Sequence, residues 1–211
     1  MMKVKICGIT HLEDAMAAAE QGADAVGFIF APESPRFVPP ETVRKIIDAL
    51  PPFVTTVAVF TAGVEKDFRY AIDECGVDLI QFHGPFSPEV IAPFATRAIG
   101  VIRVRDEKSL EEIARVSARA ILLDAYHPQQ LGGSGEVFDW TIAATAAPSA
   151  RVILAGGLTP ENVAAAVARV RPYGVDVSSG VEKIKGKKDA MKIKRFIEAA
   201  KRAGDTNVAA E

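Results

Sequence analysis

Two reactive side chains stand at the ends of apolar, strand-like runs. Cys7 ends the run KVKIC, and Asp124 ends the run AILLD. A cysteine inside a strand is usually a small buried hydrophobe, but one at the end of a strand can present its sulfur to a ligand. A carboxylate in the same kind of place can either cap a loop or transfer protons. Both residues are therefore candidates for a site.

Two further polar side chains occupy comparable places. Arg36 lies in the loop-like stretch SPRFVPP, and His83 follows the apolar run DLIQF. A planar guanidinium group suits a ligand carboxylate, although Arg36 can equally be a solvated loop cation. For His83 the sequence leaves a site role and a structural role open.

Glycine-rich turns after the last two strand-like runs predict a phosphate site. Gly156 and Gly157 follow RVILA, and Ser179 and Gly180 follow GVDVS. Glycine lets backbone amides approach a ligand closely, and the amides at the start of the short helical stretch VEK attract anions. The alternative is that these glycines only cap turns.

The first strand-like run predicts an ion pair close to the thiol. In an extended strand Lys3, Lys5 and Cys7 share one face. Asp176 lies in the last strand-like run, which would close against the first in a barrel, so we expect Lys5 and Asp176 to pair inside it. A neighbouring cation favours the thiolate form of a cysteine.

The elements that must position these residues are eight apolar, β-branched runs that alternate with amphipathic helical patterns. Parallel neighbours need crossover helices, so the alternation predicts an all-parallel sheet. An open doubly wound sheet is the alternative, but CGITHL lacks the G-x-G-x-x-G turn expected after its first strand. We predict a single-domain (β/α)8 TIM barrel of near-minimal size over residues 1–203 and a frayed tail over 204–211. The runs span residues 3–7, 24–30, 55–60, 78–82, 98–104, 120–124, 151–155 and 174–178.

Local signals place helix ends and the second cysteine. In such a barrel the C-terminal ends of the strands form the catalytic face. Cys75 precedes the fourth strand and falls on the opposite face, so it cannot pair with Cys7. Thr159 and Ser109 are predicted helix N-caps. Three helix-to-strand joints carry a glycine expected in the left-handed conformation, namely Gly22, Gly76 and Gly174.

Composition and charge argue against several classes of protein. The chain has 211 residues, 49% of them hydrophobic and 25% charged, with a formal net charge of −2. It has no Lys/Arg cluster interleaved with aromatics, so nucleic acid is not an expected partner. No apolar run reaches membrane-spanning length, so no membrane association is expected. Without a recognisable signal peptide the cytoplasm is the expected location, and two cysteines provide no disulfide framework.

A set of short phrases runs through almost the whole chain in one order. They are KVKICGIT, GADAVGFIF, SPRFV, QFHG, LLDA, GGSGEVFDW, LAGGLTPENV, GVDVSSGVE and GKKD. Together they make the sequence resemble the phosphoribosylanthranilate isomerase family of tryptophan biosynthesis. The departures are small, with Ser134 in place of an expected threonine and Phe82 in place of an expected leucine. Neither falls on a residue that would act in the reaction.

The resemblance implies an Amadori rearrangement. The N-glycosidic aminoaldose phosphoribosylanthranilate would become the open-chain aminoketose carboxyphenylamino-deoxyribulose phosphate. No metal or organic cofactor is expected, because the substrate's own nitrogen acts as the electron sink. Cys7 would be the general base, Asp124 the general acid, and Arg36 would bind the anthranilate carboxylate. For these roles Cys7 must react as a thiolate with a pKa below its free value, and Asp124 must hold a proton.

The resemblance also implies the other site residues and the partners. A small phosphosugar–anthranilate substrate is the expected ligand, and both a monomer and a homodimer fit the fold. His83 and Asp176 would line the site without an assigned role. The phosphate would bind to Gly156, Gly157, Ser179 and Gly180.

Other phosphate-binding barrels are the nearest alternatives. A metal-dependent epimerase would need several His and Asp ligands at strand ends, yet His83 and His127 are the only histidines near the predicted face. A Schiff-base aldolase, or a barrel that forms indole-glycerol phosphate, would need catalytic lysines that the sequence does not place there. A related aminoaldose of histidine biosynthesis carries two phosphates, and the sequence offers one good phosphate site. A non-catalytic phosphosugar-binding module would keep the phosphate loops but need neither Cys7 nor Asp124.

Overall fold

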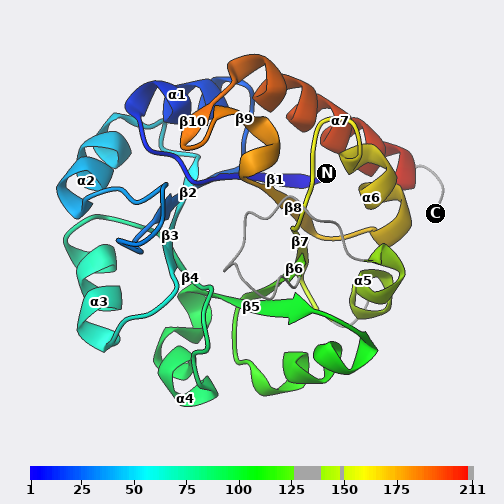
Figure 1. The fold of residues 1–211 in the computed structure, drawn as a ribbon, viewed down its shortest axis with the longest axis horizontal. Coiled ribbons are helices and arrows are strands. Elements are labelled where there is room, and N and C mark those ends of the chain that lie inside the picture. Colours follow the sequence, from blue (N-terminus) through cyan, green and yellow to red (C-terminus); the bar gives the residue numbers. More distant parts are fainter. Residues whose placement is uncertain (126–138, 148–149, 209–211) are drawn as a thin grey trace.

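The chain folds into a closed barrel of parallel strands surrounded by helices (Figure 1). The computed structural model describes residues 1–125, 139–147 and 150–208. Strands β1 to β8 pair in sequence order, and β8 closes the barrel against β1 with Lys5 opposite Asp176. The predicted eight-stranded parallel barrel is therefore confirmed. His127 and Ser134 lie outside the described residues.

The barrel strands occupy the predicted runs with small shifts at their ends. They are short and rich in apolar residues because both faces of a parallel strand are covered, one by the helices and one by the barrel interior. The strands are β1 Lys3–Cys7, β2 Ala25–Ile29, β3 Thr55–Phe60, β4 Leu79–Phe82, β5 Ala98–Val104, β6 Ala120–Ala125, β7 Val152–Leu154 and β8 Gly174–Val177.

Helical segments connect consecutive strands and form the outer layer (Figure 1). After β8 the chain also makes a small antiparallel hairpin, β9 Glu182–Ile184 with β10 Lys187–Lys188, and the short helical stretch predicted at VEK is wrong, because only its first residue belongs to a helical turn. The α-helices are α1 Leu12–Glu20, α2 Pro40–Ala49, α3 Glu65–Asp73, α4 Pro88–Ile91, α5 Trp140–Ala146, α6 Val163–Val170 and α7 Ala190–Val208. The 3₁₀ segments are η1 Ala92–Arg97, η2 Glu107–Arg115 and η3 Ser179–Val181.

The predicted N-caps differ from the observed ones. Ser109 does not begin a helix, because η2 is a 3₁₀ segment that starts earlier and is capped by Asp106. The Asp106 carboxylate accepts a hydrogen bond from the Ser109 amide at 3.1 Å, which is the contact an N-cap makes. Thr159 accepts from the amide of Glu161 at 3.2 Å, but in the turn that precedes α6, whose cap residue is Asn162. Both predictions placed the cap on the wrong residue.

One of the three predicted left-handed glycines is wrong. Gly22 and Gly76 have φ values of 87° and 78°, as expected for the end of a helix. At the third joint the left-handed residue is Arg171, with φ 49°. Gly174 is instead the first residue of β8, and a Cβ there would lie 3.0 Å from the carbonyl oxygen of Lys3. Close approach of two strands accounts for this glycine.

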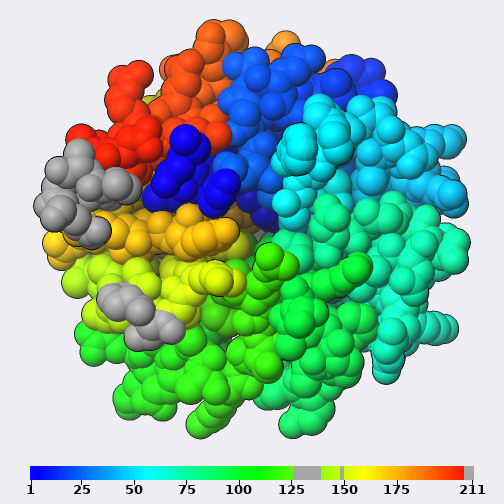
Figure 2. All heavy atoms as spheres, turned by 180° about the vertical axis from the view of Figure 1, so that it is seen from behind, coloured from blue at the N-terminus to red at the C-terminus, as the bar shows by residue number. Residues whose placement is uncertain are grey.

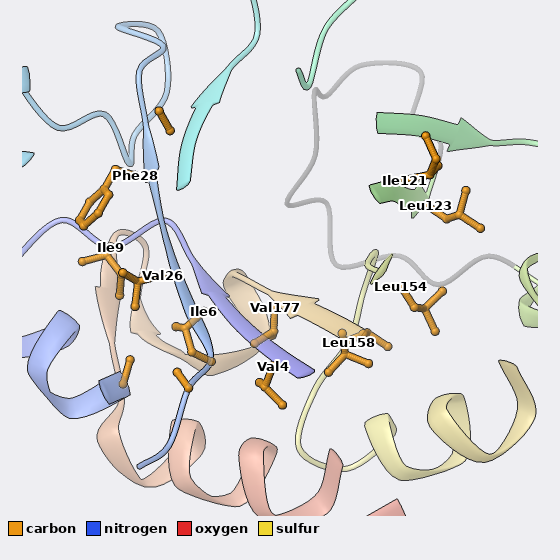
Figure 3. Packing of buried hydrophobic residues seen from close by; sticks show 14 of the residues in the cluster. Val4, Ile6, Ile9, Val26, Phe28, Ile121, Leu123, Leu154, Leu158 and Val177 are labelled. Carbon is orange, nitrogen blue, oxygen red and sulfur yellow. The ribbon is translucent and has the colours of Figure 1, made fainter. Parts of the chain in front are cut away.

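Two hydrophobic layers hold the barrel together. The larger lies between the strands and the helices, and Figure 3 shows Val4 and Ile6 of β1 beside Val177 of β8 within it. The smaller layer fills the barrel interior. Its members come from alternate positions of β3, β5 and β6 and from the region of β7, namely Val57, Ile99, Ala120, Leu122, Ile153 and Ala155. These layers fix the strand ends that carry the site.

The C-terminal helix packs against the start of the chain. Figure 2 shows the blue N-terminal residues close to the red end of the chain, on the face opposite to that of Figure 1. Gly204 is buried, and a Cβ there would lie 2.6 Å from the Cβ of Met2. Residues 204–208, predicted to fray, continue α7, while 209–211 lie outside the described residues. In the described part of the chain, no helix combines the length and apolarity that crossing a membrane requires.

Candidate active site

A cavity of about 430 Å³ opens at the C-terminal ends of the strands. The residues around it come from different strands and the loops that follow them, because a parallel barrel turns all strand C-termini to one face. The structure brings every predicted site residue to this cavity. They are Cys7, Arg36, His83, Asp124, Gly156, Gly157, Asp176, Ser179 and Gly180.

Cys7 is the last residue of β1 and is buried at the floor of the cavity. Lys5, on the same face of β1, donates a hydrogen bond to Asp176 at 3.0 Å, which confirms the predicted ion pair. Gly27 of β2 lies opposite Cys7, and a Cβ there would come within 2.9 Å of the sulfur and 3.1 Å of Lys5 Nζ. The glycine therefore leaves the space in which the thiol and the ammonium group meet.

The predicted lowering of the Cys7 pKa is not found. Burial raises the pKa of the Cys7 thiol, and the ammonium group of Lys5 opposes this effect only in part. Asp176 compensates the charge of Lys5 and itself disfavours a second negative charge nearby. Burial alone would lower the pKa of Lys5, but Asp176 and Cys7 outweigh it and raise that pKa. In this arrangement the sulfur is mainly a thiol at neutral pH.

Asp124 is buried, and its two carboxylate oxygens have different neighbours. Oδ1 accepts a hydrogen bond from the amide of Ala125 at 3.0 Å. Oδ2 lies 3.2 Å from Nε2 of His83, without hydrogen-bond geometry. Gly156, at φ 83°, passes so close that a Cβ would lie 3.1 Å from Oδ1 and 2.6 Å from the Ala125 nitrogen. The carboxylate thus sits where the end of β6 meets the loop after β7.

His83 is oriented by Gln81, a site residue that sequence reasoning missed. Gln81 Nε2 lies 3.0 Å from Nδ1 of His83. With the amide donating, Nδ1 accepts, and the proton of the neutral imidazole is on Nε2, which lies 3.2 Å from Asp124 Oδ2 without hydrogen-bonding to it. The Oε1 atom of Gln81 is buried in the cavity wall and has no hydrogen-bond partner among the described residues. Strand alternation was the available signal, because Gln81 shares a face with the position of His83.

The loops after β7 and β8 have the geometry of an anion cradle. Within the described ranges the amides of Gly156 and Gly157 donate to no other residue, and Gly157 has φ 62°. Asn162 holds this loop: its Nδ2 donates to Gly157 O at 2.9 Å, and its Oδ1 accepts from the Thr159 amide at 2.8 Å. A Cβ on Gly180, in the loop after β8, would collide with the carbonyl oxygen of Leu158, in the loop after β7. The two loops are therefore in direct contact.

Arg36 lines the cavity, but its guanidinium group already has a protein partner. Nε donates to Glu182 Oε1 at 2.7 Å, and Nη2 donates to Oε2 at 2.8 Å. Lys188 donates to Glu182 at 3.2 Å and to the carbonyl oxygen of Ser178 at 3.0 Å. Sequence reasoning did not select Glu182 or Lys188. The available signal was weak: both are charged residues in the segment between the last strand of the barrel and the C-terminal helix.

The cavity therefore combines groups that can move protons with groups that can hold two anionic ends of a small molecule. Cys7 and Asp124 are the candidates for proton transfer, the two loops can hold a phosphate, and Arg36 can hold a carboxylate. Among the described residues, no group of three or more His, Cys, Asp or Glu side chains is placed to bind a metal ion.

Comparisons with known sequences point to one family. The family model for N-(5'phosphoribosyl)anthranilate (PRA) isomerase matches residues 4–199. A relative named N-(5'-phosphoribosyl)anthranilate isomerase, from Pelobacter propionicus, is 52% identical over 201 residues, which are 95% of this chain and 96% of the relative. One of the same name from Geobacter sulfurreducens is 49% identical over 201 residues, covering 95% of this chain and 99% of the relative.

Solved structures agree with the sequence comparisons. The crystal structure of phosphoribosyl anthranilate isomerase from Thermotoga maritima has a TM-score of 0.89 and 42% identity, covering 96% of this chain and 100% of that one. A phosphoribosyl anthranilate isomerase in complex with reduced 1-(o-carboxyphenylamino)-1-deoxyribulose 5-phosphate has a TM-score of 0.85 and 41% identity, with coverage of 96% and 100%. With a family model matching most of its length and relatives about half identical across it, the chain belongs to the N-(5'-phosphoribosyl)anthranilate isomerase family.

Proposed function

We propose that this protein catalyses the isomerisation of N-(5'-phosphoribosyl)anthranilate to 1-(2-carboxyphenylamino)-1-deoxyribulose 5-phosphate, a step of tryptophan biosynthesis. The observation that carries the proposal is the joint placement of Cys7 and Asp124 on one cavity that also holds the two glycine-rich loops. A phosphosugar bound by these loops would lie between the thiol of β1 and the carboxyl group of β6. Family membership supports the same reaction.

Two proton transfers at different atoms make up the proposed reaction. Asp124, as the general acid, gives its proton to the ring oxygen, and the ring opens to a protonated Schiff base. Cys7, as a thiolate, then takes the proton from C2', which the adjacent iminium makes acidic. The resulting enolamine tautomerises to the ketone. No electrons leave the substrate, because its nitrogen accepts the electron pair from C2' and returns it in the last step.

The two anionic ends of the substrate would be held on opposite sides of the reacting carbons. The amides of Gly156, Gly157, Ser179 and Gly180 would bind the phosphate, supported by the open amides and the left-handed turns of this region. Arg36 would bind the anthranilate carboxylate, as its position in the cavity wall and its guanidinium chemistry suggest. Fixing both ends brings the sugar into register with the acid and the base.

Because the pKa of Cys7 is raised, the site must favour deprotonation of its thiol before it can act as a base. Burial disfavours the thiolate, and Lys5 and Lys188 are the cations that oppose this effect. Deprotonation would thus be assisted by charge from two sides, one from inside the barrel and one from the hairpin after β8. His83 would lie between its neighbour Gln81 and the acid Asp124, with its Nε2 atom close to the carboxyl group.

A fluorescence assay tests this function. Phosphoribosylanthranilate is incubated with the protein, and loss of anthranilate-type fluorescence reports conversion. We expect turnover with this substrate and little with the two-phosphate aminoaldose of histidine biosynthesis. Binding of phosphoribosylanthranilate with no change in fluorescence would overturn the proposal and favour a non-catalytic phosphosugar-binding module.

The setting of the reaction is also proposed. We place the enzyme in the cytoplasm, where biosynthetic enzymes act, and expect either a monomer or a homodimer. A solved relative from Thermotoga maritima, 39% identical with a TM-score of 0.85 and coverage of 96% of this chain and 100% of that one, is described as monomers generated from a dimeric protein. Light scattering after size-exclusion chromatography would distinguish the two states.

A further inference from the structure

We propose that Glu182 is a positioning residue for substrate recognition: it holds the guanidinium group of Arg36 by one edge, so that the remaining edge meets the carboxylate of the substrate. This inference rests on the proposed function, because it takes the anthranilate carboxylate as the ligand of Arg36. It concerns a residue outside the predicted site, and it names how specificity for a carboxylated aromatic ring would arise.

The contact between the two side chains fixes the guanidinium in its plane. Arg36 Nε and Nη2 donate to the two oxygens of Glu182 at 2.7 and 2.8 Å. Two parallel charge-assisted hydrogen bonds allow one orientation of the planar group, whereas a single bond would allow rotation. Nη1 has no hydrogen-bond partner among the described residues, and Arg36 belongs to the cavity wall. The edge that carries Nη1 is the one left for a ligand.

Glu182 is itself held by two lysines. Lys192 of α7 donates to its backbone carbonyl oxygen at 2.8 Å, and Lys188 of β10 donates to its Oε1 at 3.2 Å. The amide of Lys188 in turn donates to Asp14 of α1 at 3.0 Å. The hairpin β9–β10 is thus anchored to the helices on both sides of β1. A residue supported in this way can transmit a fixed orientation to Arg36.

The charges in this group are not balanced. Arg36 and Lys188 both donate to the carboxylate of Glu182, so in this trio two cations share one anion, and burial lowers the pKa of Lys188. Lys188 Nζ has three acceptors, Ser178 O at 3.0 Å, Glu182 Oε1 at 3.2 Å and Ser178 Oγ at 3.5 Å, which match the three hydrogens of an ammonium group. Burial alone would raise the pKa of Glu182, but Arg36 and Lys188 outweigh it and lower that pKa, so the carboxylate is charged. One further anion, such as a carboxylate of the substrate, would give Arg36 a second charged partner.

The loop that follows β1 packs directly against Arg36 and Ser178. Gly8, next to Cys7, has φ 71°, and a Cβ there would lie 2.7 Å from Arg36 Cδ and 2.8 Å from Ser178 Oγ. The carboxylate-binding edge is therefore set at a fixed distance from the strand that carries the thiol. Orientation of Arg36 by Glu182 would in this way also place the substrate relative to Cys7.

The test measures a preference between two ligands. One ligand is reduced 1-(o-carboxyphenylamino)-1-deoxyribulose 5-phosphate, and the other is the same compound without its carboxyl group. Calorimetry gives a Kd for each, and their ratio is the preference for the carboxylate. Glu182→Gln is compared with the wild type and with Glu65→Gln, a matched control that breaks an exposed Glu–Arg pair with Arg69 at 2.6 Å on α3. Circular dichroism checks that each variant is folded.

The expected result is a fall in this ratio of at least about tenfold in Glu182→Gln, since charge-assisted hydrogen bonds contribute on that scale. Removing a negative charge would by itself strengthen the binding of an anion, so a fall reports lost orientation. Glu65→Gln should keep the wild-type ratio, and Glu182→Asp, which keeps the charge but is shorter, should give an intermediate one. In turnover, KM for phosphoribosylanthranilate should rise more than kcat falls in Glu182→Gln.

A ratio that stays constant or rises in folded Glu182→Gln would overturn the inference. If that variant does not fold, Glu182→Asp decides alone, and a wild-type ratio in it would have the same consequence. Failure of the proposed function is seen elsewhere, in a wild-type protein that does not turn over phosphoribosylanthranilate. The two failures are therefore distinguishable, because one appears in the wild type and the other in the variants of an active enzyme.

Discussion

Strand β1 carries two lysine–aspartate pairs that share residue type and differ in environment. Lys3, at the N-terminal mouth of the barrel, donates to Asp24 at 2.7 Å, with side-chain exposures of 46% and 25%. Lys5, two residues further, donates to Asp176 at 3.0 Å, with exposures of 5% and 9%. The exposed pair is shorter, yet water screens it, whereas the buried pair cannot lose one member without leaving an unsolvated charge. Burial, and not distance, determines how much each pair matters.

The two cysteines, one at each end of the barrel, also share a residue type and differ in their surroundings. Both are free and buried, and burial raises the pKa of both thiols. Of the two, Cys7 lines the cavity and lies beside Lys5, while Cys75 lies in the connection between α3 and the start of β4, away from the strand C-termini. Because Arg44 also favours the thiolate of Cys75, the cavity at Cys7 and not the neighbouring cation distinguishes the two buried sulfurs.

The largest expected effect is a loss of kcat on substitution of Cys7 or Asp124, and substitution of Cys75 should cause no such loss. Cys7→Ala and Asp124→Ala should each lower kcat by about 10²–10⁴-fold, because each removes a general acid or base. Cys75→Ala is the matched control, and its kcat should equal that of the wild type. Steady-state fluorescence assays with circular dichroism measure both. Near-wild-type turnover in Cys7→Ala, or a comparable loss in Cys75→Ala, would contradict the assignment.

The next effect concerns the buried pair. Lys5→Met should lower the free energy of unfolding by about 3–5 kcal/mol, because Asp176 would remain charged and buried without a partner. Urea denaturation followed by circular dichroism measures this change. The double variant Lys5→Met with Asp176→Leu should recover much of the loss, since no charge is left unpaired. A double variant as unstable as Lys5→Met would show that packing, and not charge, is responsible.

A pH profile sharpens the comparison of the cysteines. The thiolate of Cys7 is the reactive form and its pKa is raised by burial, so the fraction of thiolate should increase about tenfold per pH unit along the limb below that pKa. In Lys5→Met the pKa of Cys7 should rise further, which moves this limb to higher pH. The profile is measured in a Cys75→Ala background, where ultraviolet absorbance of the thiolate reports Cys7. Complete formation of the Cys7 thiolate already at neutral pH would contradict the raised pKa.

The smallest effect belongs to the exposed pair. Lys3→Met should lower the free energy of unfolding by less than about 1 kcal/mol, because solvent screens its interaction with Asp24. The difference from the wild type should shrink further in high salt, whereas the loss in Lys5→Met should change little. A destabilisation by Lys3→Met as large as that by Lys5→Met would show that burial does not determine how much each ion pair contributes to stability.

Most of the fold and the positions of the site were readable from the sequence. The predicted runs 3–7, 55–60 and 98–104 coincide with β1, β3 and β5, because runs rich in apolar and β-branched residues mark strands covered on both faces. The Lys5–Asp176 pair followed from strand alternation and from closure of β8 on β1. The cap at Ser109 and the left-handed role of Gly174 were wrong, since each depends on a neighbour that competes for the same position.

Local periodicity thus determined which segments are strands, which strand ends share a face, and hence that Cys7, Asp124 and the glycine-rich loops meet. Only the tertiary structure decided the burial, the partners and the pKa of each group in the site. Glu182 reaches Arg36 across 146 positions of the chain, and Asp14 reaches Lys188 across 174. The pKa of Cys7 depends on its burial and on Asp176 and Lys188 from distant parts of the chain, which no local pattern encodes. Burial and long-range partners are properties of the closed barrel, because they arise only when distant strands and helices pack together.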